Sequence, residues 1–333
     1  MRIFSGIQPT GRKHLGNYIG AIRQYVDGQD RGDPAIYCVV DLHATSVPYD
    51  PRALRSHVLD TTAMLLAAGL DPARCILFRQ SDVKEHAELC WLLSSVTAYG
   101  ELTRMHQFKD KSARERELVR ASLFLYPVLQ AADILAYKTD EVPVGDDQRQ
   151  HLELTRDIAE RFNATYAEVF PLPRHRIPEV GARIMDLKDP TAKMSTTYGS
   201  EAGLIYVDDE PDAIRTKLGR AVTDSGTEIV RRPDKPGVSN LVEIMAVARG
   251  ADPTQVEREF DGQGYGVFKR AVADAVADFL APVRERYREL RPDEASLEAV
   301  LRDGAERARA LASETMVEVR DAMGIGAPVG ARV

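Results

Sequence analysis

The sequence predicts an α/β fold, with a doubly wound parallel sheet in its first part and a helical region after it. Residues 35–42 form a near-continuous apolar run, which is typical of a strand buried on both faces of a parallel sheet. Short strand patterns alternate with helical patterns over the first half of the chain. Beyond about Asp209 the strand patterns fade and helical periodicity dominates. The length of 333 residues suits about two domains.

The first three strands and the first three helices follow this alternation. Apolar residues at helical spacing from Leu15 to Val26 predict the first helix, and Gly69 is placed to end the second one. The expected strands cover residues 2–7, 35–42 and 75–78, and the expected helices cover residues 15–26, 53–68 and 85–96.

Proline and glycine divide the rest of the chain. A helix that begins near Glu115 reaches Pro127, which should end or kink it, and a second helix continues to about Tyr137. A short β-branched strand over 141–144 precedes a further amphipathic helix. The proline-rich and turn-rich stretches at 170–178 and 187–203 are expected to be loops, and the clearest later helices cover residues 240–247, 268–287 and 296–323.

Two polar, glycine-containing turns follow expected strands. Residues 8–17 come directly after the first strand and open a helix, and residues 145–148 follow the fourth strand. Open α/β sheets bind ligands at the carboxyl ends of their strands. Two glycines could let the backbone approach a phosphate and two side chains could donate hydrogen bonds to it: Gly11, Gly16, His14 and Asn17. Taken alone, such a turn is as often an ordinary connection, so both interpretations stay open here.

Charge and composition limit the function classes. The net charge of −7 argues against a general nucleic-acid coat, which would carry a basic face throughout. The three cysteines lie far apart in apolar stretches and the seven histidines form no ligand pattern, so we expect no protein-bound structural metal. No apolar run approaches the length of a membrane span and no secretory signal is visible, so we expect a cytoplasmic protein without a membrane partner.

Two basic stretches could form local patches for nucleic acid in spite of the acidic net charge. A solvated face is the more common role of such charge runs. The first stretch comprises Arg104, Lys109, Lys111, Arg114, Arg116 and Arg120, and the second comprises Arg215, Lys217, Arg220, Arg231, Arg232 and Lys235.

A distant loop, Lys193-Met194-Ser195, gives the first turn a more specific meaning. Together with His14-Leu15-Gly16-Asn17, it resembles the two ordered motifs of the class I aminoacyl-tRNA synthetases. Further segments are similar to the tryptophanyl-tRNA synthetases of that class, and this similarity covers nearly the whole chain. These segments are residues 4–11, 100–105, 107–112, 131–135, 142–148, 180–185, 221–225 and 262–268.

The resemblance implies a Rossmann-like catalytic domain with a C-terminal helical domain. Such an enzyme activates L-tryptophan with ATP to tryptophanyl-adenylate and transfers it to tRNA(Trp), with release of AMP and diphosphate. Mg2+ would accompany ATP, held mostly by phosphate oxygens. A homodimer with tRNA bound across both subunits, and anticodon contacts near 215–235, are also implied. The implied parts are a catalytic domain at 1–186, a signature loop and helical anticodon-binding region at 187–290, and a C-terminal helix at 291–333 that packs back on the catalytic domain.

The resemblance also assigns residues around ATP. Lys193, Ser195 and Lys111 are the implied catalytic residues, and contact with tRNA or solvent is the alternative for Lys111. Asp147 could instead interact with the N-terminus of the next helix. The implied ATP contacts are Gln8, Pro9, Thr10, Gly16, Asn17, Gly145, Asp146, Asp147, Ile184, Lys193, Met194, Ser195, Thr196 and Thr197.

Asp133 is the leading candidate for amino-acid specificity. It lies in an apolar segment, where an unpaired carboxylate is costly to bury. The resemblance assigns it to the indole N–H of tryptophan, and a structural salt bridge to a lysine or an arginine is the alternative. The residues implied to border the same pocket are Phe4, Gly6, Gln8 and His43. For His43, a place in the core is an equally good interpretation.

The second motif departs from the family pattern. The usual loop reads Lys-Met-Ser-Lys-Ser, whereas here Thr196 and Thr197 follow the serine, so the second lysine is missing. A hydroxyl can donate a hydrogen bond to phosphate but carries no charge to offset the leaving pyrophosphate. Our hypothesis is that Lys193, helped by Lys111 or Arg12, takes more of this charge.

Three other functions stay open at this point. A tyrosyl-tRNA synthetase would share the fold, although the context of Asp133 favours tryptophan. A small-molecule adenylyltransferase would share the first turn and the sheet, but it would need neither the helical half nor the distal loop. A non-catalytic paralogue is supported only by the missing lysine.

Overall fold

The computed structural model describes residues 1–333 except 106–118, 144, 146–147, 177–182, 197–198 and 327–333. The strands of the described part are β1 (Ile3–Ile7), β2 (Ala35–Val39), β3 (Ile76–Arg79), β4 (Glu141–Pro143) and β5 (Arg174–Arg176). They form one parallel sheet in the order β3-β2-β1-β4-β5. β2 and β3 lie on one side of β1, and β4 and β5 lie on the other, so the strand order reverses at β1. An open α/β sheet has its ligand crevice at such a reversal.

Alternate residues of the central strands enter two separate cores. Ile3 and Tyr37 belong to one buried apolar cluster, whereas Phe4 and Ile36 belong to the other. β2 is buried along its whole length. Its apolar run therefore shows no polar alternation, because both faces of the sheet are covered. The doubly wound class predicted from this run is confirmed.

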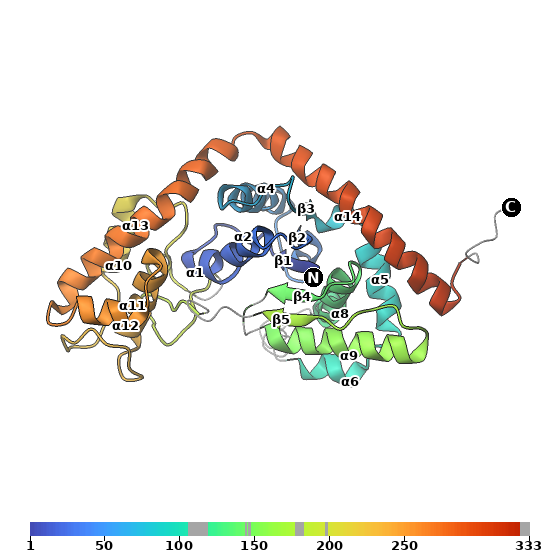
Figure 1. The fold of residues 1–333 in the computed structure, drawn as a ribbon, viewed down its shortest axis with the longest axis horizontal. Coiled ribbons are helices and arrows are strands. Elements are labelled where there is room, and N and C mark those ends of the chain that lie inside the picture. The colour runs from blue at the N-terminus through green and yellow to red at the C-terminus, as the bar shows by residue number, and fades with distance from the viewer. Residues whose placement is uncertain (106–118, 144, 146–147, 177–182, 197–198, 327–333) are drawn as a thin grey trace.

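Helices lie on both sides of the sheet and form the distal part of the molecule (Figure 1). Those of the first half are α1 (Leu15–Asn17), the π-helical turn η1 (Tyr18–Ile22), α2 (Arg23–Asp30), α3 (Asp41–Ala44), α4 (Pro51–Ala67), the 3-10 turn η2 (Gln80–Asp82), α5 (Glu85–Ser94), α6 (Tyr99–Arg104), α8 (Ala121–Leu135) and α9 (Arg149–Thr165). Those of the second half are the 3-10 turn η4 (Glu201–Gly203), α10 (Pro211–Gly219), α11 (Pro236–Arg249), α12 (Pro253–Glu259), α13 (Gly264–Leu290) and α14 (Glu294–Met323). In the described part of the chain, no helix is both long enough and apolar enough to cross a membrane.

Two long helices, α13 and α14, form an arch over the rest of the molecule (Figure 1). α13 packs against α10, α11 and α4, and α14 crosses β3, α4 and α5. Gly304 permits this crossing, because a Cβ at its position would lie 1.9 Å from the carbonyl oxygen of Leu77 in β3. Arg79 at the end of β3 donates hydrogen bonds to both carboxylate oxygens of Glu298 in α14, at 3.2 and 2.6 Å. α14 thus covers an edge strand that would otherwise be open to pairing.

Three elements differ from those expected. The strand expected over 35–42 ends at Val39, because α3 begins at Asp41. Pro127 neither ends its helix nor separates two helices: α8 continues through it, since packing against α5 and α9 outweighs a cost of roughly 3 kcal/mol for an internal proline. β5 lies within residues 170–178, which were expected to form a loop. Its Arg-His-Arg sequence, on the edge of the sheet, has no apolar alternation that would mark a strand. The helix start expected near Glu115 lies outside the described residues.

Candidate active site

The turn after β1 enters α1 through a capping box. His14 Nδ1 accepts a hydrogen bond from the Asn17 backbone N at 3.2 Å, and Asn17 Oδ1 accepts one from the His14 backbone N at 3.2 Å. Gly16 leaves room for the His14 ring, because a Cβ at its position would lie 3.1 Å from two ring atoms. Three residues of the first motif are therefore fixed against one another.

The chain beyond the second motif is bonded to this turn. Leu15 N donates to Ile205 O at 2.7 Å, and Val207 N donates to Lys13 O at 2.9 Å. These two bonds form an antiparallel bridge centred on His14 and Tyr206. The segment that leaves the Lys-Met-Ser loop thus returns to the first turn.

The Lys-Met-Ser loop itself contacts the first turn. Met194 N donates to Ile184 O at 2.9 Å, which closes a second antiparallel bridge at the base of the loop. The Met194 side chain is buried, whereas Lys193 is exposed. A Cβ at Gly16 would lie 3.6 Å from the Cβ of Met194, which is van der Waals contact. The structure therefore brings together the two motifs that lie far apart in the sequence.

Two buried polar side chains hold the base of this loop. Asn240 in α11 accepts from the Met185 backbone N at 2.9 Å and donates to the Met185 carbonyl at 3.0 Å. Asp186 accepts from the backbone N of Lys188 and of Asp189, at 2.7 and 3.1 Å. Neither anchor was predicted, since Asn240 lies inside a helical pattern with no neighbour in sequence to suggest its partner.

Burial, together with nearby positive charges, keeps the His14 ring neutral. Burial, together with the charges of Lys13 and Lys193, lowers the pKa of His14 to about 4. Because Nδ1 accepts from the Asn17 backbone, the ring proton is assigned to Nε2, which is then a donor. The turn thus presents a neutral donor among cations, an arrangement that suits an anionic ligand.

Arg12 is paired with carboxylates. Its Nε lies 3.0 Å from Asp208 and its NH2 lies 2.9 Å from Asp209. The guanidinium also lies 4.1 Å above the centre of the Tyr206 ring. Because these carboxylates already offset its charge, the pairing argues against the part of our hypothesis in which Arg12 compensates for the missing lysine.

Asp133 on α8 is buried and accepts three side-chain hydrogen bonds. Oδ1 accepts from Gln80 Nε2 and from His86 Nδ1, each at 2.6 Å, and Oδ2 accepts from His43 Nε2 at 2.8 Å. Burial alone would raise the pKa of Asp133, but the hydrogen bonds from His43 and His86 outweigh it and hold the pKa below its usual value. The carboxylate is therefore charged at neutral pH.

This network replaces the salt bridge considered from the sequence. Among the described residues, the side-chain partners of Asp133 are two histidines and an amide, and not the lysine or arginine of the alternative. The Tyr137 hydroxyl lies 2.7 Å from His86 Nε2, and burial raises the pKa of Tyr137 well above 10.0, so this hydroxyl keeps its proton and donates. His86 is then a neutral ring whose own proton points to Asp133.

One acceptor position is left on Asp133 among the contacts of the described residues. Each carboxylate oxygen can accept two hydrogen bonds, and Oδ1 accepts two while Oδ2 accepts one. The His43 ring lies edge-on to Tyr126, with ring centres 6.4 Å apart. Asp133 can therefore take one further donor, next to an aromatic neighbour.

Phe4 and Gly6, expected to border the tryptophan pocket, lie on β1. Phe4 is buried and stacks on Tyr137 with ring centres 5.4 Å apart, so it contacts the Asp133 network. A Cβ at Gly6 would lie 2.8 Å from a methyl carbon of Val40, so Gly6 has no room for a side chain. Contact of either residue with tryptophan stays a prediction.

The other residues predicted to contact ATP differ in exposure. Those exposed are Gln8, Thr10 and Thr196, those half-buried are Asn17, Gly145 and Ser195, and those buried are Pro9 and Ile184. Gly145 follows β4, the strand next to β1, so both turns lie at the same edge of the sheet. Lys111, Asp146, Asp147 and Thr197 lie outside the described residues.

Sequence reasoning missed three residues of this region: Gln80, His86 and Lys13. Gln80 directly follows β3, at the sheet edge where ligands bind, and this position alone could have marked it. His86 gave no comparable signal, because it lies between charged residues in a helical pattern. Lys13 was passed over because a lysine in a loop is ordinarily exposed, whereas here its side chain is buried.

Several cations of the second basic stretch form ion pairs within the chain. In the second basic stretch, Arg215 pairs with Asp274, Arg231 with Glu257 and Lys235 with Asp224, at 3.0 to 3.1 Å. This pairing favours the solvated-face interpretation over an RNA patch.

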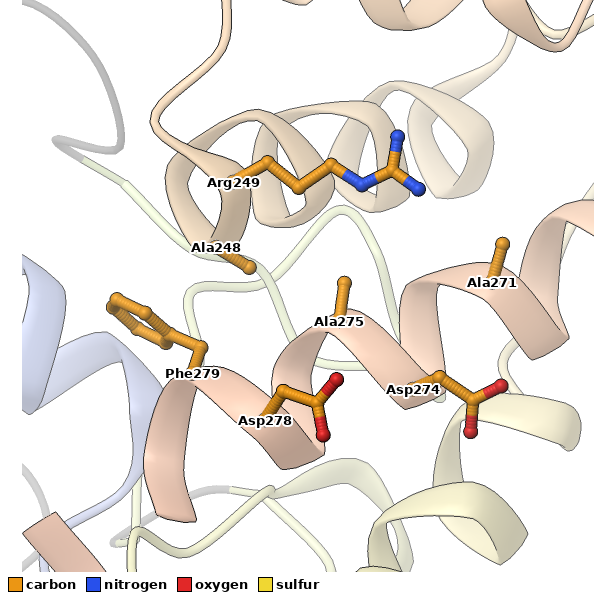
Figure 2. Close-up of a pocket in the computed structure, with 7 residues that line it drawn as sticks. All are labelled: Ala248, Arg249, Ala271, Asp274, Ala275, Asp278 and Phe279. Atoms are coloured by element: carbon orange, nitrogen blue, oxygen red, sulfur yellow. The ribbon is translucent and has the colours of Figure 1, made fainter. Parts of the chain in front are cut away.

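A cavity of about 600 Å³ lies between α11 and α13. Figure 2 shows Arg249 above Asp274 and Asp278 on its walls. Arg249 is bonded to Glu259 at 2.7 Å, and Asp274 to Arg215 at 3.0 Å. The cavity contains none of the predicted site residues, so the two motifs, and not this cavity, define the candidate active site.

Comparison with known families accounts for the two motifs. Residues 1–281 match the family described as tRNA synthetases class I (W and Y). The chain belongs to this family. Within the class I synthetases it is similar to tryptophan–tRNA ligase 1 of Streptomyces avermitilis, with 49% identity over 328 residues that make up 97% of this chain and 98% of that protein. The resemblance predicted from the turn and the loop is thereby confirmed.

Solved synthetase structures share the architecture. The tryptophanyl-tRNA synthetase of Mycoplasma pneumoniae superimposes with a TM-score of 0.90 at 34% identity, over 98% of both chains. That of Campylobacter jejuni, in complex with ADP and tryptophan, superimposes with a TM-score of 0.81 at 35% identity, over 98% of this chain and 100% of that one. The Rossmann-like sheet followed by a helical C-terminal part is therefore confirmed.

Proposed function

We propose that this chain attaches L-tryptophan to tRNA(Trp) at the expense of ATP, through tryptophanyl-adenylate, with AMP and diphosphate as the other products. The observation that carries the proposal is the contact between the first turn and Met194, next to the reversal of strand order at β1. The family match over 1–281 and the 49% identity to a tryptophan–tRNA ligase support the same reaction.

In the first step, a carboxylate oxygen of tryptophan attacks the α-phosphorus of ATP. The bond from this phosphorus to the bridging oxygen breaks as the new bond forms, and the negative charge that develops leaves with pyrophosphate. We infer that Nε2 of His14 donates to the phosphate chain and that Lys193 supplies positive charge, with Ser195 beside it. Positioning and charge neutralisation dominate such transfers, because the protein need form no covalent bond.

Mg2+ is the proposed companion of ATP. Among the described residues, no group of three or more histidine, cysteine, aspartate or glutamate side chains could hold a metal ion. The donors at the first turn, His14 and Asn17, suit phosphate oxygens. The ion would accordingly be held by the phosphate chain, whose hard oxygens it prefers, and would neutralise charge there.

For the amino acid, we propose that Asp133 accepts the indole N–H. Its charged state and the acceptor position left on Oδ2 support this role. Phenylalanine has no ring donor, and the tyrosine hydroxyl lies at the tip of a narrower ring, so neither places a donor where the indole N–H does. A site that requires a hydrogen bond of this kind can reject an analogue without the donor by roughly 10⁴ to 10⁵.

The test is aminoacylation of tRNA by the purified protein with each aromatic amino acid in turn. We expect charging with tryptophan, and charging with tyrosine or phenylalanine that is slower by about 10⁴. Preferred charging with tyrosine would identify a tyrosyl enzyme instead. Amino-acid-dependent ATP–pyrophosphate exchange without transfer to tRNA would favour a small-molecule adenylyltransferase, and the loss of both activities would favour a non-catalytic paralogue.

We also propose a homodimer, with tRNA bound across both subunits. Trp91 on α5 and Tyr99 on α6 are each 74% exposed, and the Tyr99 ring centre lies 5.2 Å from that of Phe124 on α8. Large apolar side chains that are this exposed are candidates for an interface. Trp91→Ser should weaken self-association in sedimentation equilibrium, and a monomeric wild-type protein would contradict the proposal.

The division at 1–186, 187–290 and 291–333, the anticodon contacts near 215–235 and a cytoplasmic location are likewise proposals. The crossing of β3 by α14 supports the return of the C-terminal helix to the sheet. One apolar cluster includes residues of both the sheet and α13, so the helical region shares a core with the catalytic one. The ion pairs between 215 and 235 weaken the case for RNA contacts there.

A further inference from the structure

Lys13 is buried inside the turn that joins β1 to α1. Its exposed fraction is 4%, and its Nζ donates to the carbonyl oxygen of Gln8 at 2.8 Å. The backbone carbonyl of Lys13 accepts from Val207 N at 2.9 Å, which fixes the residue from its other side. A lysine is rarely buried to this extent without a charged partner.

The ammonium of Lys13 has no carboxylate within ion-pair distance in the described part of the chain. Asp60 is the carboxylate that acts on it from farther away, and Asp60 is itself paired with Arg291. Burial lowers the pKa of Lys13 to about 7, against the opposing effect of Asp60. The amine is therefore only partly protonated near neutral pH, and an anion bound nearby would favour its charged form.

The contact with Gln8 fixes the backbone where ATP is proposed to bind. The Gln8 carbonyl accepts from Thr10 N at 2.9 Å as well as from Lys13, so both of its acceptor positions are used. The charge of Lys13 also reaches the neighbouring ring, since it contributes to the lowered pKa of His14. Lys13 thus has two effects on the first turn: it holds the Gln8 carbonyl through a hydrogen bond, and its charge lowers the pKa of His14.

We propose that Lys13 is a positioning residue for ATP, whose ammonium fixes the Gln8 carbonyl and takes the phosphate chain as its counter-charge. This inference rests on the proposed function and deepens it. The Lys-Met-Ser loop has Thr196 where the family has a second lysine. Lys13 would supply positive charge in its place, from the first turn instead of from the loop. A charge held in a partly desolvated site attracts an anion more strongly than one in water.

The experiment measures tryptophan-dependent ATP–pyrophosphate exchange for Lys13→Met and Lys13→Gln. Methionine keeps the length of the side chain without the charge or the donor, whereas glutamine keeps a donor for the Gln8 carbonyl without the charge. We expect both variants to raise the KM for ATP and for pyrophosphate by about tenfold, with the KM for tryptophan changed by less than about twofold. A Lys13→Gln enzyme with wild-type KM for ATP would overturn the role of the charge.

Thr196→Lys tests the relation to the missing lysine. In the Lys13→Met background, this change should restore a larger fraction of the affinity for ATP than it adds in the wild-type background, because both lysines would serve the same charge. Equal gains in the two backgrounds would mean that the sites act independently and would contradict the inference.

Thermal unfolding separates positioning from a role in the fold. We expect Lys13→Met to melt at a higher temperature than wild type, because it removes a buried amine that has no charged partner among the described residues. Lys235→Met is the matched control: Lys235 is also buried, at 5% exposed, but pairs with Asp224 at 3.0 Å, so its loss should lower the melting temperature. A lower melting temperature for Lys13→Met would make Lys13 a structural residue. Wild-type protein without any exchange would reject the proposed function itself, independently of these variants.

Discussion

The two ends of the proposed site are built in different ways. Around Asp133, the side chains of His43, Gln80 and His86 come from regular elements or directly follow them, and they satisfy one another almost completely. Around His14, two irregular segments are joined mainly by backbone hydrogen bonds, and the described residues place no carboxylate within ion-pair distance of the buried Lys13. The amino-acid end is thus nearly complete without ligand, whereas the phosphate end holds a buried lysine whose charged form a bound anion would stabilise.

This contrast follows from the chemistry of the two ligands. An indole brings one donor and a large apolar surface, so a buried network with one acceptor left can recognise it by geometry. A triphosphate brings several negative charges that a carboxylate network would repel. We therefore expect substitutions at Asp133 to alter the choice and binding of the amino acid, and substitutions around His14 to alter ATP.

The largest effect is expected from Asp133→Asn. The amide group of asparagine would place a donor against His43 or against Gln80 and His86, all of which donate to the carboxylate. With its nitrogen against His43, it would also lose the acceptor proposed for the indole. We predict a fall in kcat/KM for tryptophan of about 10³ to 10⁴ in pyrophosphate exchange, with little change in the KM for ATP.

Asp30→Asn is the matched control for this substitution, because Asp30 is exposed and pairs only with the exposed Arg74 on the surface, at 2.9 Å. It should leave kcat/KM for tryptophan near the wild-type value. If Asp133→Asn kept wild-type kcat/KM for tryptophan while remaining folded, the proposed role of Asp133 in recognising the amino acid would be wrong.

The next effect concerns pH and the phosphate end alone. The pKa of His14 is about 4 in the folded chain against an ordinary value of 6.5, so the unfolded chain binds the proton first as the pH falls. The stability linked to His14 is therefore present above pH 6.5 and is lost as the pH falls through 4, by about 3 kcal/mol in total. His14→Asn keeps an acceptor for the cap but does not titrate.

Urea unfolding of both proteins between pH 6.5 and pH 4 measures this loss. The wild-type protein should lose more free energy of unfolding than His14→Asn over that interval. Equal losses would show that His14 is not held neutral by its surroundings. Carboxylates also titrate in this interval and affect both proteins. The test is therefore the difference between the two proteins in the free energy of unfolding that each loses.

The sequence predicts the fold and the meeting of the two motifs better than it predicts the side chains that support them. Apolar runs such as 35–39 and the order of strands and helices reflect burial, which is encoded locally. The donors to Asp133 come from positions 43, 80 and 86, and their approach depends on how the elements pack. Such long-range contacts leave no periodic pattern.

Lys13 and Pro127 show that tertiary packing can override a prediction made from local sequence. Local chemistry predicts that a loop lysine is exposed and that a proline ends or kinks a helix, but Lys13 is buried and α8 continues through Pro127, because packing outweighs these local preferences. Asn240 illustrates a third case, in which an inconspicuous helical residue anchors a loop distant in sequence. A local sequence pattern can mark a candidate residue, whereas a residue whose role depends on its tertiary partners leaves no such mark.

The smallest effect, and the most specific to the phosphate end, is expected from Gly16→Ala. The added Cβ would lie 3.1 Å from the His14 ring, which is a crowded contact, and 3.6 Å from Met194 Cβ, which is ordinary contact, so it would displace the His14 ring within the first turn without removing any polar group. We predict an increase of about tenfold in the KM for ATP and no more than about twofold in that for tryptophan. Gly219→Ala is the matched control, since a Cβ there meets nothing within 4 Å. Equal increases in both KM values for Gly16→Ala would mean that the two ends of the site are mechanically coupled, contrary to the independence that their different construction predicts.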